Sequence, residues 1–201
     1  AEGFRTQVRG TQVAQRNAQD GISLVQTAEG ALSETTNILQ RVRELAVQSA
    51  NGTQSSANRI ALNNEVQQLI AQVEDIALDT EFNGINVLSA NQSITLQTGA
   101  NTSQTLRVSI GGARSTDLNV NTVNISATAG AIAALSTVDA ALASVNSIRS
   151  TLGAFQNRLE FTINTLSIQE ENAASAESSI RDADIARETI QFTRNQILVN
   201  A

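Results

Sequence analysis

The 201-residue sequence has no cysteine, histidine, methionine, proline, tryptophan or tyrosine, and all 13 of its basic residues are arginine. Without cysteine and histidine it has no disulfides and none of the usual zinc-ligand patterns. The missing histidine, cysteine and lysine also exclude Ser–His, Cys–His and Ser–Lys nucleophile pairs and Schiff-base lysines. Its 5 phenylalanines supply few rings to line a substrate pocket. We therefore expect neither an enzyme nor a bound cofactor.

Charge and hydropathy argue against two further kinds of partner. The formal net charge is -6 and the pI is about 4.7, whereas nucleic-acid binding requires clustered cations. No run reaches the roughly 18 to 20 consecutive apolar residues of a membrane-spanning helix. The chain starts at Ala1, without methionine and without the pattern of a secretion signal. We expect no nucleic-acid or membrane partner, and we expect the chain to be a piece of a longer protein.

Apolar residues recur at intervals of three and four from Phe4 to Ala50, with no proline and few glycines. This period predicts one long helix with an apolar stripe along one side and a second row, spaced by sevens, beside it. The stripe residues are Ala18, Ile22, Val25, Ala28, Leu32, Thr35, Leu39, Val42 and Ala46, and the second row is Leu24, Ala31, Ile38 and Leu45. A helix of this length must bury its stripe against other long helices.

A turn follows at 51–56, where Asn-Gly and two serines combine the signals of a helix end and a new helix start. The apolar spacing then resumes in alternating steps of four and three, which predicts a second helix folded back antiparallel along the first. Its apolar positions are Leu62, Val66, Leu69, Val73 and Ile76. The segment 81–84, which contains Asn-Gly, ends this period.

Between Gly84 and Gly111 the apolar period changes from helical to two, which is typical of strands. The alternating apolar residues are Ile94, Leu96, Leu106, Val108 and Ile110. The loop-forming residues 99–103 lie between the two sets, so we expect a small antiparallel hairpin. The segment 114–127 is rich in Asn, Ser and Thr and is expected to be an irregular surface connection.

From about Ala129 the helical period returns and runs nearly to the end of the chain. Its stripe comprises Val138, Leu142, Val145, Ile148, Leu152, Phe155, Leu159, Ile163 and Leu166, and a row in sevens continues through Ala176, Ala183, Ile190 and Ile197. The apolar run of Ile197, Leu198 and Val199 predicts that this stripe continues into a further segment or is covered by a neighbouring molecule.

These patterns predict a mainly α fold, an elongated antiparallel bundle of long helices with a small antiparallel β-hairpin region. We expect one domain over 1–201, with an N-terminal helical arm at 1–79, a hairpin insert and connection at 80–128, and a C-terminal helical arm at 129–201. Alanine and valine occupy many stripe positions, and these small side chains bury little apolar area per residue. Assembly with other copies would compensate for this.

Acidic residues on the predicted helices do not indicate a metal site. They are Glu74, Asp75, Asp79, Asp182 and Asp184, with apolar residues between them. Calcium sites instead converge about six or more oxygens, usually on a loop. We expect these carboxylates to face solvent.

Two segments resemble the first long helix of bacterial flagellins: DGISLVQTAEGAL at 20–32 and LQRVRELAVQ at 39–48. Three more resemble later flagellin segments in the same order: EFNG at 81–84, LGAFQNRL at 152–159 and ESSIRDAD at 177–184. The resemblance implies a structural subunit of the flagellar filament, a secreted extracellular protein of motility, here as a core domain without the family's terminal helices. It implies other flagellin subunits and an export chaperone as partners.

The same resemblance implies recognition by the flagellin-sensing Toll-like receptor of vertebrates. The positions that match the recognised type are Gln40, Arg41, Leu45 and Glu65. Arg41, Leu45 and Gln48 are spaced i, i+4 and i+7 and share a helix face, and arginine is a frequent interface anchor. From the residues alone, Arg41 and Glu44 also fit a solvated helix pair with Leu45 in the core.

Other assignments stay open from the sequence. The hook-filament junction protein shares the helical-arm architecture, although the intact first-helix motif favours flagellin. A stand-alone helical adhesin or binding module would use the exposed helix faces to bind a host partner. An enzyme built from Asp, Glu, Ser, Thr and Arg is the least favoured.

Overall fold

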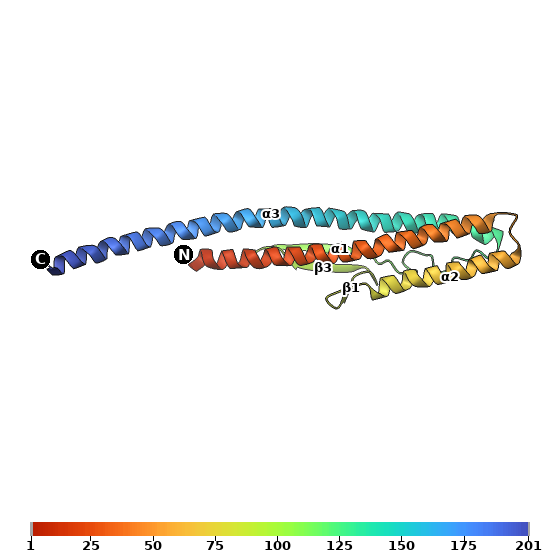
Figure 1. Cartoon of the computed structure of the whole chain (residues 1–201), viewed down its shortest axis with the longest axis horizontal. Helices are drawn as coiled ribbons and strands as arrows, with labels where there is room; N and C mark the ends of the chain where they lie inside the picture. Colours follow the sequence, from red (N-terminus) through yellow and green to blue (C-terminus); the bar gives the residue numbers. More distant parts are fainter. Residues whose placement is uncertain (1, 201) are drawn as a thin grey trace. The chain divides into compact units, whose positions relative to one another are not determined.

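A computed structural model describes residues 2–200, with the side chains of all of these except residues 184, 199 and 200. The elements are α1 (Glu2–Ala50), α2 (Ser56–Asp79), β1 (Glu81–Phe82), β2 (Ile85–Asn86), β3 (Gln92–Gln97), β4 (Thr105–Ile110) and α3 (Thr128–Asn200), shown in Figure 1. Helices make up 73% of the chain. The predicted mainly α fold with long helices and a small antiparallel strand region is confirmed. The expectations for Ala1 and for the side chains of Asp184 and Val199 lie outside the described residues.

Contacts divide the chain into two compact units. The first comprises Ala1–Asp20, Leu96–Leu106 and Leu159–Ala201, and the second comprises Gly21–Thr95 and Arg107–Arg158. Each unit contains part of α1, part of α3 and part of the β3–β4 pair. The single domain expected over 1–201 stays a prediction.

In the second unit, α1 runs antiparallel to both α2 and α3. The Arg43 Nε donates to Asp139 Oδ1 at 2.7 Å, and the Arg149 Nε donates to Glu29 Oε1 at 2.8 Å, so higher numbers on α3 face lower numbers on α1. Figure 1 shows α2 alongside the C-terminal part of α1. The predicted stripe of α1 is confirmed, because all nine of its residues are buried, including Leu32, Leu39 and Val42 at 0% exposure.

The turn between α1 and α2 is held by side chains at both of its ends. Arg59 on α2 donates its Nε to the Ser49 carbonyl at 2.9 Å and its Nη2 to the Asn51 carbonyl at 3.0 Å. The first bond satisfies a carbonyl that the end of α1 leaves without an intrahelical donor, and the second holds the turn that follows. At the start of α2, the Ser55 Oγ accepts from the Asn58 N–H at 3.1 Å as an N-cap.

A second strand pair was missing from our expectation. β1 and β2 pair antiparallel with Phe82 opposite Ile85, so Asn83 and Gly84 form a two-residue loop with φ of 51° and 75°. Both angles lie in the left-handed region that type I′ hairpin turns require and that Asn-Gly adopts readily. Asn-Gly between apolar residues was the signal for a hairpin rather than for a plain helix end.

The connection between β4 and α3 is irregular, as predicted, but it is not a surface segment. Its apolar side chains are buried, namely Ala113, Leu118, Val120, Val123 and Ile125. Polar side chains of α2 satisfy its backbone: the Gln67 Nε2 donates to the Val123 carbonyl at 2.8 Å, and the Asn63 Oδ1 accepts from the Ile125 N–H at 2.8 Å. The expectation failed because the many Asn, Ser and Thr residues hide an apolar residue at every second or third position.

Glu74 on α2 fixes the start of this connection. Its Oε1 accepts from the Arg114 Nε at 2.7 Å, and its Oε2 accepts from the Ser115 N–H at 2.9 Å and the Ser115 Oγ at 2.7 Å. Burial raises the pKa of Glu74, but the hydrogen bonds from Ser115 and Arg114 outweigh it and hold the pKa below its ordinary value. Glu74 therefore has a structural role, and our expectation that it faces solvent is wrong.

In the first unit, α1 again runs antiparallel to α3. The Gln15 Nε2 donates to the Ser167 Oγ at 3.2 Å, and the Gln12 Nε2 donates to Glu170 Oε1 at 2.6 Å. The predicted hairpin is confirmed as the β3–β4 pair, and its end lies on α1, where the Asn17 Nδ2 donates to the Gln97 carbonyl at 3.0 Å.

One described helix, α3, is long and apolar enough to cross a membrane by length and composition alone. The core helix of a soluble protein meets the same criterion. The first turns of α3 are rich in alanine, and Ala131, Ala134, Val138, Ala141 and Val145 are buried there. These buried side chains pack within the second unit, and they make up 28% of the apolar window.

Candidate interaction surfaces

The predicted receptor residues lie on α1 and α2 in the second unit, and an ion pair joins two of them. Arg41 on α1 donates its Nε and Nη2 to Glu65 Oε1 on α2, at 3.0 Å and 2.9 Å. Its Nη1 donates to Glu44 Oε2, one turn along α1, at 3.1 Å. One guanidinium therefore links two carboxylates across the two helices.

The two carboxylates further favour the charged form of Arg41, which is protonated in any case. Hydrogen bonds to Glu65 and then to Glu44 raise the pKa of Arg41 above its ordinary value. The Arg41 side chain is still 50% exposed, and that of Glu65 is 44% exposed. An oriented and accessible guanidinium can make directional hydrogen bonds to a partner.

The four predicted positions differ in exposure. Gln40, Arg41 and Glu65 are exposed, whereas Leu45 is 1% exposed. Leu45 lies at the inner edge of the face that Arg41 and Gln48 share, because the neighbouring helices cover that edge. The structure thus brings Arg41 and Glu65 together and places Leu45 in the core beneath them.

A second ion pair lies nearby that our sequence reasoning did not include. Arg43 on α1 pairs with Asp139 on α3 at 2.7 Å, and both side chains are about half exposed, at 46% and 51%. The hydrogen bonds from Arg43 lower the pKa of Asp139. Because the two residues are far apart in the sequence, no local spacing could have revealed the pair.

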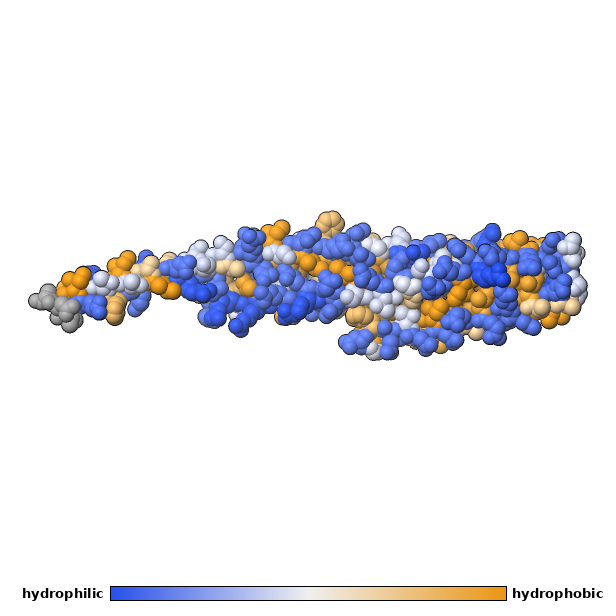
Figure 2. Space-filling model, in the orientation of Figure 1, coloured by the Kyte–Doolittle hydropathy of each residue, from blue (hydrophilic) through white to orange (hydrophobic). Residues whose placement is uncertain are grey.

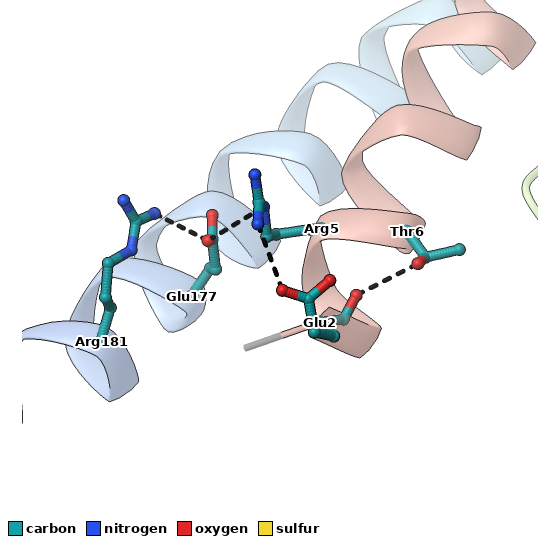
Figure 3. A network of polar contacts seen from close by, with 5 residues as sticks. All are labelled: Glu2, Arg5, Thr6, Glu177 and Arg181. Carbon is teal, nitrogen blue, oxygen red and sulfur yellow. Dashed lines mark hydrogen bonds and ion pairs between the residues drawn. The ribbon is translucent and has the colours of Figure 1, made fainter. Parts of the chain in front are cut away.

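In the first unit, charged residues form a network near the start of α1, shown in Figure 3. The Glu177 Oε1 on α3 is 2.7 Å from Arg181 Nη2 and 3.8 Å from Arg5 Nε, and Arg5 also contacts Glu2 at 3.2 Å. The Glu177 side chain is 14% exposed, whereas Arg5 and Arg181 are more than half exposed. This network joins α1 to α3 through Arg5 and Glu177.

The last described turns of α3 expose large apolar side chains. These are Ile180, Ile185, Ile190, Phe192, Ile197 and Leu198, at 40% to 68% exposure. Figure 2 shows hydrophobic surface on this part of α3, next to the C-terminal residues. We call these six residues the apolar segment of α3. Soluble proteins rarely leave so many large apolar side chains on one helix without a partner.

No group of three or more acidic residues is placed to hold a metal ion within the part of the chain that the structure describes. The candidate surfaces described above consist of ion pairs, amides and aliphatic side chains, which suits packing against other proteins.

Comparison with known proteins assigns the family. Residues 1–93 match the bacterial flagellin N-terminal helical region, and residues 135–201 match the bacterial flagellin C-terminal helical region. The flagellar filament 31.3 kDa core protein of Treponema maltophilum is 42% identical over 218 residues, covering 100% of this chain and 76% of that protein.

Solved structures agree with this match. The crystal structure of Bacillus cereus flagellin has a TM-score of 0.68 at 33% identity and covers 81% of this chain and 94% of its own. A putative flagellar hook-associated protein from Vibrio parahaemolyticus has a TM-score of 0.72 at 13% identity, covering 88% and 94% of the two chains. The second likeness shows a shared fold.

The family match and the long paired helices together place this chain among structural proteins that assemble. This chain belongs to the bacterial flagellin family. It is a structural subunit of the flagellar filament, which lies outside the cell. The predicted family and the predicted role as a filament subunit are thereby confirmed, and the family's self-association into filaments applies to it, whereas recognition by the Toll-like receptor stays a prediction.

Proposed function

We propose that this filament subunit presents the exposed face around Arg41 to the flagellin-sensing Toll-like receptor, and that its role is structural, without catalysis. The observation that carries the proposal is the Arg41–Glu65 pair, which holds a half-exposed guanidinium in one orientation across α1 and α2. A side chain already oriented loses less conformational entropy on binding than a free one. Gln40, exposed beside Arg41, adds an amide that can donate and accept.

In this proposal Leu45 acts through packing. Its buried side chain supports the backbone of α1 one turn after Arg41, and it makes no contact with the receptor. Gln40, Arg41 and Glu65 then form the contact surface, and Leu45 keeps their helix in place.

We further propose that the apolar segment of α3 carries contacts to other flagellin subunits. Its large aliphatic and aromatic side chains supply the apolar area that an obligate interface requires. The same side chains would need to be covered before assembly, and binding by an export chaperone during secretion would do this.

Replacing Arg41 with alanine tests the receptor proposal. We expect R41A to weaken receptor binding by about tenfold or more, because hot-spot arginines at interface centres cost about 2 kcal/mol or more on truncation and about 1.4 kcal/mol is tenfold. Binding would be measured with the receptor's extracellular domain, and circular dichroism would verify that helicity is retained. Exposed ion pairs contribute little to stability, so folding should change only slightly.

The matched control is Arg43→Ala. Arg43 lies on the same helix, is equally exposed and is also ion-paired, but it faces Asp139 on α3. We expect R43A to bind the receptor as the parent chain does. Equal affinities of R41A and the parent chain, or equal losses in R41A and R43A, would contradict the proposed surface.

A further inference from the structure

The chain contains two Asn-Gly pairs in different backbone environments, Asn51-Gly52 and Asn83-Gly84. An asparagine followed by glycine is chemically labile, because glycine has no Cβ to hinder attack of its own backbone nitrogen on the asparagine Cγ. That attack requires the asparagine backbone to rotate until the nitrogen lies against the side-chain amide. The two backbone environments therefore give this attack a different rate at each asparagine.

Asn51 lies in an open turn. It is the first residue after α1, and both it and Gly52 are exposed. Both Asn-Gly pairs are exposed, and a Cβ added at either glycine would meet nothing within 4 Å, so the two sites differ in backbone bonding and not in open space. Among the described residues, no carbonyl accepts from the Gly52 N–H, and the Asn51 Oδ1 accepts one long bond, 3.3 Å from the Thr53 N–H. The peptide plane that carries the Gly52 nitrogen is held by hydrogen bonds to the exposed Asn51 carbonyl, from Arg59 Nη2 at 3.0 Å and the Gln54 N–H at 3.1 Å, and these bonds can break without unpairing two strands.

Asn83 is held in a closed turn. Its φ of 51° and the 75° of Gly84 are fixed by the pairing of Phe82 with Ile85. Immediately after β2, the Val87 N–H donates to the Thr80 carbonyl at 3.0 Å, which closes the hairpin at its base. Rotating Asn83 toward attack would take it out of the left-handed region and break this pairing.

We propose that Asn51 is a site of spontaneous deamidation and that the folded hairpin protects Asn83 from the same reaction. The Gly52 nitrogen bonds to Asn51 Cγ while the bond from Cγ to Nδ2 breaks, and the nitrogen's proton leaves with Nδ2 as ammonia. Water then adds to one of the two carbonyls of the resulting succinimide. The ring opens to aspartate or to isoaspartate, and no oxidant or reductant takes part.

The product changes the turn that joins α1 to α2. The Asn51 carbonyl accepts from Arg59 Nη2 at 3.0 Å and from the Gln54 N–H at 3.1 Å. Isoaspartate routes the backbone through the side-chain carbon and converts this carbonyl into a free carboxylate, so the peptide carbonyl that accepts both bonds no longer exists. The Arg59 bond to Ser49 is independent of residue 51 and remains. The modification also adds one negative charge at this turn.

The experiment follows both asparagines in one sample. The purified chain is incubated at mildly alkaline pH and then cut after arginine, which separates Asn51, in peptide 44–59, from Asn83, in peptide 60–107. Mass spectrometry with fragmentation locates each deamidation, and isoaspartyl methyltransferase labels the isoaspartate. A second sample incubated in urea gives the two deamidation rates in the unfolded chain. The Gly52→Ala variant changes only the glycine that follows Asn51 and serves as the matched variant.

We expect deamidation at Asn51 to be about tenfold faster than at Asn83 in the folded chain, a difference of about 1.4 kcal/mol in activation free energy. In urea the two rates should approach each other, chiefly because Asn83 accelerates. G52A should slow the reaction at residue 51 and leave Asn83 unchanged. Equal rates in the folded chain, a faster reaction at Asn83, or a rate ratio unaffected by urea would each overturn the proposal.

Discussion

Replacing Leu39 with alanine is expected to lower the free energy of unfolding by about 2–5 kcal/mol. Leu39 is 0% exposed on the stripe of α1, in the second unit. Its loss removes buried methyl groups and leaves a cavity that long, regular helices cannot easily collapse to fill. Urea denaturation followed by the helical circular dichroism signal measures the change.

Leu78→Ala is the matched control for L39A. It makes the same chemical change on α2, in the same unit, at a position that is 43% exposed. We expect L78A to cost less than about 1 kcal/mol, because the side chain loses little buried area. Equal losses in the two variants would show that the α1 stripe does not form the core.

The second large effect is expected at Gly130, in the first turn of α3. A Cβ at this position would overlap the Asn124 carbonyl oxygen, a backbone atom of the connection packed on α2. The overlap should cost about 1–3 kcal/mol, more than the roughly 0.4–1 kcal/mol that alanine gains over glycine by restricting the unfolded chain. G130A should therefore unfold at a lower urea concentration than the parent chain.

Gly153→Ala is the counterpart on the same helix. Nothing lies within 4 Å of a Cβ at Gly153, so only the gain for alanine in a helix remains. We expect G153A to be more stable than the parent chain by up to about 1 kcal/mol. If G130A proves as stable as G153A, the connection does not approach α3 as described.

The sequence predicted the helices well because their apolar residues repeat over many turns. The nine stripe positions of α1 are all buried. On α2 the predicted Val66 and Val73 are at 0% exposure, whereas the predicted Leu62, Leu69 and Ile76 are half-buried and the buried positions also include Ile70 and Ala77. A long helix buries its continuous apolar stripe on one side. An incorrect assignment at one position therefore does not change the prediction of the helix or of its buried face. The β3–β4 hairpin was predictable for the same reason, from its period of two.

The features that the sequence did not predict depend on contacts between residues that are far apart in the sequence. Glu74 carries no sequence signal that distinguishes it from Asp75, yet it accepts hydrogen bonds from Arg114 and Ser115 while Asp75 is exposed. The sequence also carries no signal that shows which of the predicted receptor residues are exposed. Leu45 and Arg41 are one turn apart, and only the placement of the neighbouring helices decides that Leu45 is buried and Arg41 is exposed.

Electron microscopy of cells whose sole flagellin carries this sequence tests the central claim most directly. We predict filaments from the parent sequence and from an exposed polar control, Gln191→Ser with Gln196→Ser. Ile190→Ser with Ile197→Ser, in the apolar segment of α3, should give secreted but unassembled protein. Filaments of normal length from this double variant, or none from the parent sequence, would contradict the account.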